Sequence, residues 1–166
     1  MDVTAAIKNR RSIRKYKSKE LPPELLAEIL EAARLAPSGA NKQPWQLVAV
    51  TDKERRKELV PICKEQKFVG DCSVFIAGID DSAQKWVRVD LAIAMEHIAL
   101  AAVEKGLGTC WIGAFDQEKM NAFLEVPKGF NVTVGMTLGY PDETPDARPR
   151  KELKELVHWN KFGQRA

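Results

Sequence analysis

The sequence predicts an α+β fold with a mixed sheet, because amphipathic helical segments alternate with short apolar strands through irregular crossovers. The 166 residues suffice for one domain with a real core. Hydrophobic residues make up 45% of the chain and charged residues 30%, which is ordinary for a globular protein. Because no internal repeat, low-complexity run or linker divides the chain, we expect a single domain over residues 1–166.

Caps and prolines delimit the elements expected in the first half. Asp2 is suited to cap a short helix, and the pair Pro22-Pro23 begins a second helix that ends by Pro37. Asp52 would cap a charged helix that Pro61 closes. The ranges expected are helices at 2–8, 22–36 and 52–59 and strands at 47–50 and 74–79.

The longest predicted helix spans residues 84–105, and its apolar residues cover well over half of its circumference. Such a helix is buried on several sides, which in a small domain suggests that a partner subunit covers part of it. Gly106 and Gly108 break this helix. Strands at 109–112 and 131–138 follow, with a helix at 116–124 between them.

From Tyr140 onward the chain turns polar and proline-rich, and it ends near the short β-prone segment 156–159. An apolar segment after a proline-rich stretch often reaches another subunit. We therefore expect residues 140–166 to form a carboxy-terminal extension that packs on a partner subunit.

Charge and hydropathy indicate a cytoplasmic protein without nucleic-acid or membrane partners. The net charge of +3 is only mildly basic, and Tyr16 is the sole aromatic residue near a basic cluster, whereas nucleic-acid modules interleave the two. Residues 1–19 contain no apolar stretch typical of a secretory signal. The most apolar helical segment, 91–103, contains Glu96 and is too short to span a bilayer.

The cysteines and histidines show no pattern of a metal or catalytic site. Cys63, Cys72 and Cys110 are odd in number and widely spaced, which argues against disulfides and zinc and favours three buried free thiols. His97 and His158 have no nucleophile motif nearby. No Walker-type loop appears, and the Gly-rich run before residue 109 precedes a strand instead of opening a helix, so a dinucleotide fingerprint fails.

The segment 37–45, Pro-Ser-Gly-Ala-Asn-Lys-Gln-Pro-Trp, joins a helix to a strand. Its small residues permit close approach of a ligand to the backbone. The amides of Asn41 and Gln43 suit the edge of a polar heterocycle, and Trp45 can wall an apolar pocket. Taken alone, the segment is more simply explained as a connecting loop that needs Pro and Gly for its turns.

Two arginine clusters stand near opposite ends of the chain. Residues 10–14 read Arg-Arg-Ser-Ile-Arg, and Arg148-Pro149-Arg150 supplies a second pair. Arginine binds phosphate in bidentate fashion and keeps its charge. A solvated basic surface is the alternative for either cluster, and their convergence on one phosphate is a hypothesis.

These segments together resemble the signature of FMN-dependent nitroreductases. The arginine cluster at 10–14 and the loop at 36–45 resemble the amino-terminal part of that signature. Residues 106–115, Gly-Leu-Gly-Thr-Cys-Trp-Ile-Gly-Ala-Phe, resemble its third element, and Gly-Tyr-Pro at 139–141 with residues 148–151 its last. The resemblance is ordered and covers nearly the whole chain. It implies a three-layer α/β/α fold with a mainly antiparallel sheet of four or five strands, and a carboxy-terminal strand exchanged between subunits.

The resemblance also implies roles for individual residues. One group would hold the phosphate and ribityl chain of FMN, and Arg14 would lie at the pyrimidine edge of the flavin, where a cation stabilises the anionic reduced form. A second group would line the flavin from the other subunit of a homodimer, and a third would pass along its other face, with a backbone N–H near Gly113 at flavin N5. Gln66 would place its amide near the flavin. The residues that would hold the phosphate and ribityl chain are Arg10, Arg11, Ser12, Arg148 and Arg150. Those that would line the flavin from the other subunit are Pro37, Ser38, Gly39, Ala40 and Asn41. Those that would pass along its other face are Trp111, Ile112 and Gly113.

The implied activity is ping-pong oxidoreduction through flavin N5. NADH or NADPH would reduce the flavin, and a nitroaromatic, quinone or similar small acceptor would reoxidise it, with no side chain acting as acid or base. Two alternatives share the same binding residues: a flavin carrier or sensor without turnover, and a flavin-modifying member of the family. Only residues 80–84 separate the second strand from the long helix. The lid of longer relatives is therefore absent, which suggests an open site and argues against the deiodinase branch.

Overall fold

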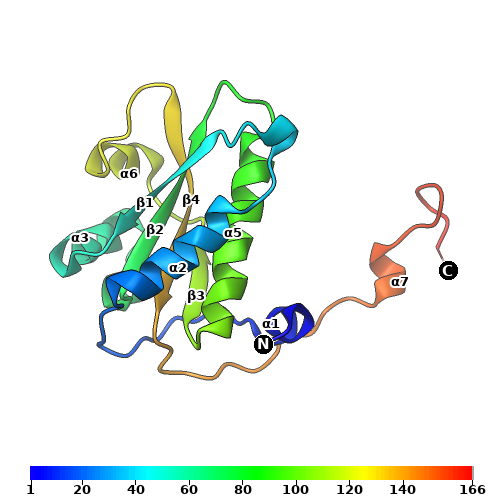
Figure 1. Cartoon of the computed structure of the whole chain (residues 1–166), viewed down its shortest axis with the longest axis horizontal. Coiled ribbons are helices and arrows are strands. Elements are labelled where there is room, and N and C mark those ends of the chain that lie inside the picture. Colours follow the sequence, from blue (N-terminus) through cyan, green and yellow to red (C-terminus); the bar gives the residue numbers. More distant parts are fainter. Residues whose placement is uncertain (166) are drawn as a thin grey trace.

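Four strands form the central sheet of the structure, a computed structural model that describes residues 1–165 (Figure 1). Their order across the sheet is β1, β2, β4, β3, and every neighbouring pair is antiparallel. The sequence predicted a mixed sheet from its irregular crossovers, and the resemblance implied a mainly antiparallel one. The strands β2 and β3 run in the same direction, but β4 lies between them, so among the four strands every pairing is antiparallel. The strands are β1 (Trp45–Val50), β2 (Val74–Asp81), β3 (Gly108–Ile112) and β4 (Phe130–Gly139).

Helices cover both faces of this sheet, so the α+β class and the three layers are confirmed (Figure 1). On one face α2 packs against α5, and α1 packs on α5 in turn. On the other face α3 contacts α4 and α6. The helices are α1 (Val3–Asn9), α2 (Pro23–Arg34), α3 (Lys53–Ile62), α4 (Phe68–Asp71), α5 (Val87–Glu104), α6 (Gln117–Phe123) and α7 (Leu153–Leu156), with a 3-10 turn, η1 (Gly39–Asn41).

The central strand β2 separates two hydrophobic cores because its side chains alternate between the faces of the sheet. Ile76 belongs to the core under α2 and α5, whereas Phe75 and Ala77 belong to the core under α3 and α6. All three side chains are fully buried. Burial on both sides explains why this strand reads as a continuous apolar run.

Most element boundaries lie within two or three residues of those expected. The helix α5 begins at Val87 because residues 84–86 form turns, and the Asp2 cap of α1 is confirmed by its bond from the Ala5 amide at 2.8 Å. Pro61 does not close α3, which continues to Ile62, since a proline in the last turn removes only one backbone bond. The four-residue α4 is too short to have a sequence period, and the sequence did not predict it.

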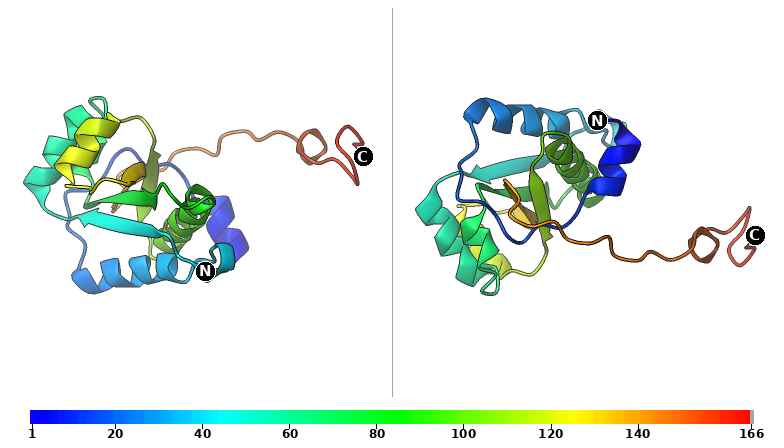
Figure 2. Two further views of the ribbon diagram at one scale, coloured as in Figure 1. Left: turned by 90° about the horizontal axis from the view of Figure 1, so that it is seen from above. Right: turned by 90° about the horizontal axis from the view of Figure 1, so that it is seen from below.

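The carboxy-terminal extension contains no strand in this single chain. The segment 156–159, expected to be β-prone, forms no strand within the single chain: α7 ends at Leu156, and residues 159–163 form bends and turns. Exchange of a carboxy-terminal strand between subunits stays a prediction. A strand needs a neighbour for its backbone hydrogen bonds, and this segment has none within its own chain. Figure 2 shows the extension running away from the three layers. Ala166, the last residue of the predicted domain, lies outside the described residues.

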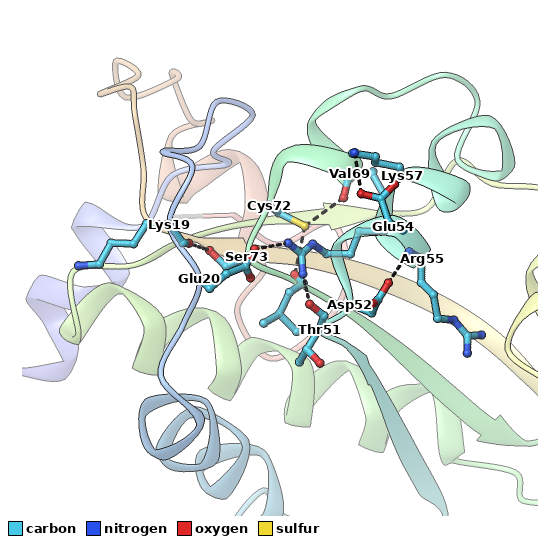
Figure 3. A network of polar contacts seen from close by, with 12 residues as sticks. Lys19, Glu20, Thr51, Asp52, Glu54, Arg55, Lys57, Val69, Cys72 and Ser73 are labelled. Carbon is cyan, nitrogen blue, oxygen red and sulfur yellow. Dashed lines mark hydrogen bonds and ion pairs between the residues drawn. The ribbon is translucent and has the colours of Figure 1, made fainter.

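Buried polar contacts fasten the segment after the first arginine cluster to the sheet (Figure 3). The Ser73 hydroxyl donates to the Lys19 carbonyl at 2.6 Å. The Arg56 guanidinium, 2% exposed, bonds Glu20 at 2.8 Å and the Thr51 carbonyl. Removing one partner of a buried, charged network is costly, so these contacts fix the path of the chain that leads away from the site.

Candidate functional site

The two arginine clusters meet at one cavity of about 600 Å³. Six cationic side chains line it and only two carboxylates, which makes the cavity a strong anion site. The sequence did not indicate Lys8 or the two acids, because none of them belongs to a recognisable pattern. The lining residues are Ile7, Lys8, Arg10, Arg11, Ser12, Arg14, Glu143, Pro145, Asp146, Ala147, Arg148 and Arg150.

The first cluster is positioned by its contact with β3. The Ile13 amide donates to the Thr109 carbonyl at 2.9 Å, and Ser12 forms a parallel bridge with Thr109. Gly108 permits this approach, because a Cβ on that residue would lie 2.5 Å from Cγ1 of Ile13. The arginines on either side of Ile13 are thereby held at the edge of the sheet while Ile13 itself is buried in the core.

Arg11 has both satisfied and unsatisfied donors. Its Nη1 donates to the Lys8 carbonyl at 2.7 Å and to the Arg10 carbonyl at 2.9 Å, whereas its Nε is buried without a partner. Nε of Arg10 lies 4.0 Å from the Glu96 carboxylate. The weakly engaged Arg10 side chain leaves donors for an anion in the cavity.

The second cluster reaches the cavity because the chain after β4 runs alongside residues 14–17. The backbone N–H of Lys17 donates to the Tyr140 carbonyl, and the backbone N–H of Asp142 donates to the Lys15 carbonyl, each at 2.9 Å. The Arg14 amide donates to the Glu143 carboxylate at the cavity. This antiparallel course carries Arg148 and Arg150, both exposed, to the cavity that the first cluster also lines.

The loop at 37–44 lies at a different place and lines none of the arginine cavity. Three of its residues, Ala40, Asn41 and Gln43, have left-handed φ angles of 51°, 55° and 50°. Such angles cost non-glycine residues of the order of 1–3 kcal/mol each and cluster at functional sites. The Gln43 amide group donates to the Asn41 carbonyl at 3.0 Å, so these two side chains brace the loop. Trp45 belongs to β1 and is half-buried.

Ser38 and Gly39 hold the loop to the rest of the domain. The Ser38 hydroxyl oxygen accepts a hydrogen bond from the backbone N–H of Gln43 at 2.9 Å. The Gly39 backbone N–H donates to the carboxylate of Asp90, which lies in the first turn of α5, at 3.1 Å. Asp90 is 5% exposed, and nothing in the sequence marked it as a partner of the loop. Pro37 is exposed at the start of the loop.

Gln66 lies beside the residues that follow β3. The Gln66 amide donates to the Ala114 carbonyl at 3.2 Å, next to Gly113, and to the Cys63 carbonyl at 2.8 Å. Ile112 as a whole is 1% exposed, so it supports the end of β3 from within the core. Trp111 is half-buried and Gly113 exposed. These residues line no pocket together with the arginine cluster or the loop within one chain.

The cysteines are three buried free thiols, as expected. Burial raises the pKa of Cys63 and of Cys72 to about 12, and it also raises the pKa of Cys110. All three thiols therefore stay protonated at neutral pH, which makes them poor nucleophiles. Within residues 1–165 no group of His, Cys, Asp and Glu side chains is arranged to bind a metal ion. Over the same residues no helix has the length and apolar character needed to cross a bilayer.

The raised thiol pKa values predict that stability falls in alkali. Above about pH 8.5 the unfolded chain loses thiol protons that the native state keeps, so the unfolded state binds fewer protons. The free energy of unfolding should fall by up to about 1.4 kcal/mol per pH unit for each thiol until the native thiols titrate. Urea denaturation from about pH 8 to about pH 10 measures the slope. Cys63→Ala/Cys72→Ala should flatten it, and equal slopes in both proteins would contradict the prediction.

Comparison with known proteins follows the same segments. The model of the Nitroreductase family matches residues 7–72 and 65–140. A Methanothermobacter thermautotrophicus protein with the provisional name NADH dehydrogenase/NAD(P)H nitroreductase is 36% identical, over 89% of this chain and 82% of that protein. The structure of an FMN-dependent nitroreductase from Clostridium difficile is 33% identical, with a TM-score of 0.87 over 96% of this chain and 99% of that one. NADPH:FMN oxidoreductase from Vibrio harveyi, solved with NAD+, is 28% identical, with a TM-score of 0.93 over 98% of this chain and 78% of that one.

Proposed function

We propose that this chain, which belongs to the nitroreductase family, is an FMN-dependent oxidoreductase that takes electrons from NAD(P)H. The observation that carries the proposal is the convergence of two arginine clusters, far apart in sequence, on one cavity. The names of similar proteins support both halves of it: one is an NADPH-flavin oxidoreductase of Vibrio harveyi and another an FMN reductase [NAD(P)H] of Bacillus subtilis.

The donor set of the cavity fits a flavin that carries a phosphate. Arg10, Ser12, Arg148 and Arg150 would hold the phosphate and ribityl chain, since guanidinium groups and a hydroxyl are good phosphate donors. Arg11 also lines the cavity, and its guanidinium adds a further positive charge beside a bound phosphate. The net positive lining favours FMN over a flavin without phosphate.

The chain's own residues would bind and orient, without acid or base catalysis. A bound flavin would supply the redox chemistry, accepting hydride from NAD(P)H and passing electrons to a nitro compound, a quinone or a similar acceptor in a ping-pong sequence. Arg14 at the cavity would favour negative charge on the reduced ring. Gln66 and the backbone at Gly113 would contact the edge of the flavin ring. The hydrogen bond from the Gln66 side chain to the Ala114 carbonyl holds Gln66 beside Gly113.

The site needs a second copy of the chain, because the loop at 37–44 does not reach the arginine cavity of its own subunit. A homodimer would bring the loop of one subunit to the flavin of the other. Large apolar side chains are exposed on the helices and tail where such a partner would pack, which include Val3, Ile7, Val89, Leu153, Leu156, Trp159 and Phe162. Exposed large apolar side chains of this kind are stabilised when a partner covers them.

Anaerobic mixing with NADH or NADPH tests the proposed turnover. The purified protein should be yellow, and one of the two nucleotides should bleach its flavin band; reoxidation by a quinone or nitroaromatic should restore it. A yellow protein that neither nucleotide bleaches would support a flavin carrier or sensor instead. A flavin recovered in chemically altered form would support a flavin-modifying enzyme. A colourless protein that fails to bind added FMN would refute all three.

A further inference from the structure

A second pocket, of about 270 Å³, lies between the loop and the start of α5. Its lining combines an aromatic ring, small and apolar residues, and two lysines. We call it the Trp86 pocket; its lining residues are Gly39, Ala40, Lys42, Pro44, Gln84, Lys85, Trp86 and Asp90. None of these except Gly39 and Ala40 was a predicted site residue, and both belong to the loop that we place against the flavin.

The aromatic component of this pocket is unusually exposed. Trp86 is 58% exposed, although burial of a tryptophan is strongly favourable. The Lys85 ammonium lies 5.1 Å from the centre of its ring. The connection that bears both residues is only a few residues long, so no inserted helix of this chain covers the ring. An exposed indole beside a concave site is a stacking surface for a planar ligand.

The electrostatic component is a pair of cations from two different segments. Lys42 comes from the loop and Lys85 from the turn before α5. Among residues 1–165 neither ammonium has a carboxylate within 4.0 Å. The one acid in the lining, Asp90, is 5% exposed and accepts from the Gly39 amide. The accessible charge of the pocket is therefore positive.

We propose that the Trp86 pocket selects planar aromatic electron acceptors that carry a negative charge, such as aromatic carboxylates. The ring would stack on Trp86, and the anionic group would lie between Lys42 and Lys85. This inference rests on the proposed oxidoreductase function, and it names the substrate class of that site. Because Gly39 and Ala40 line both the pocket and the proposed flavin wall, an acceptor held here lies against the segment that touches the cofactor.

Equilibrium binding tests the inference without turnover. We would titrate the protein as purified with 2-naphthoate and with 2-naphthamide, which match in shape and differ in charge, and follow tryptophan fluorescence and calorimetry. Partly exposed ion pairs are modest, so two lysines should give the carboxylate about a tenfold tighter Kd. Lys42→Gln/Lys85→Gln should abolish that difference, and Trp86→Leu should weaken both ligands alike. Equal Kd values for the two ligands in the unaltered protein would overturn the inference.

Steady-state rates give an independent readout. The ratio of kcat/KM for 4-nitrobenzoate to that for 4-nitrobenzamide should fall about tenfold in Lys42→Gln/Lys85→Gln, and comparing ratios between proteins cancels the intrinsic reactivity of the acceptors. The control is Lys105→Gln, which removes one lysine charge just beyond the opposite end of α5, about 27 Å away, whereas the pocket variant removes two. An equal fall in the control, or a change confined to the KM for NADPH, would refute an acceptor role. Failure of the proposed function shows instead as absent flavin or absent bleaching.

Discussion

Arg10→Ala combined with Arg150→Ala should release FMN from an otherwise folded protein. The two guanidiniums line the same cavity and come from opposite ends of the sequence. Charge-assisted hydrogen bonds are among the strongest that a protein offers a phosphate, so loss of two should weaken FMN binding by about 10²- to 10⁴-fold. Flavin content after gel filtration and a fluorescence titration with added FMN measure the effect.

The fold should survive this double substitution. The Arg10 side chain makes only a 4.0 Å contact with Glu96, and the Arg150 side chain bonds backbone carbonyls of its own segment. Without flavin, the double variant and the unaltered protein should therefore have the same thermal unfolding midpoint. Arg34→Ala is a matched control, because Arg34 is exposed on α2 and paired with Glu31 at 2.6 Å, away from the cavity. Normal FMN retention in the double variant would refute the phosphate assignment.

Leu156→Asp with Trp159→Asp should convert a dimer into monomers. Both side chains are more than half exposed on an extension that runs away from its own domain (Figure 2). Apolar groups so presented are stabilised by burial against a second subunit, and two buried carboxylates without partners would cost far more than that burial contributes. Light scattering at micromolar concentration measures the mass.

Loss of the dimer should also lower the flavin content, because we propose that the loop at 37–44 lines the flavin of the other subunit. Lys154→Asp is the control: it introduces the same carboxylate on the exposed helix α7 without removing an apolar contact. Unaltered protein that is already monomeric at micromolar concentration would contradict the dimer. A monomeric variant that keeps its full flavin content would show that one chain completes the site alone.

Local features of the fold were predictable from the sequence, whereas long-range pairings were not. Asp2, Asp52 and Asp116 cap helices as expected, because a cap depends on neighbours a few residues away. Placement of β4 between β2 and β3 depends on contacts across the whole chain, which no local period encodes. The tail was expected to be β-prone, but the missing neighbour decides its conformation.

The candidate site divides in the same way. Its arginines were identifiable because their chemistry is specific and because the ordered motifs resemble a family. Glu143 and Asp90 were missed, since a single acid has no recognisable pattern. Each accepts a hydrogen bond from a backbone N–H, and these bonds help to shape the site. The Trp86 pocket was missed for another reason. It arises only where the loop and the turn before α5 come together, and neither segment is distinctive alone.

The pairing of residues 140–142 with residues 15–17 has a consequence for the order of events during synthesis. The first arginine cluster leaves the ribosome early, but its cavity is completed only when Arg148 and Arg150 have followed. If FMN binds in this cavity as proposed, its capture should be a late step, after Arg148 and Arg150 have joined the first cluster. The bound phosphate would then bridge two segments far apart in the sequence, so it should protect residues 141–147 from proteolytic nicking.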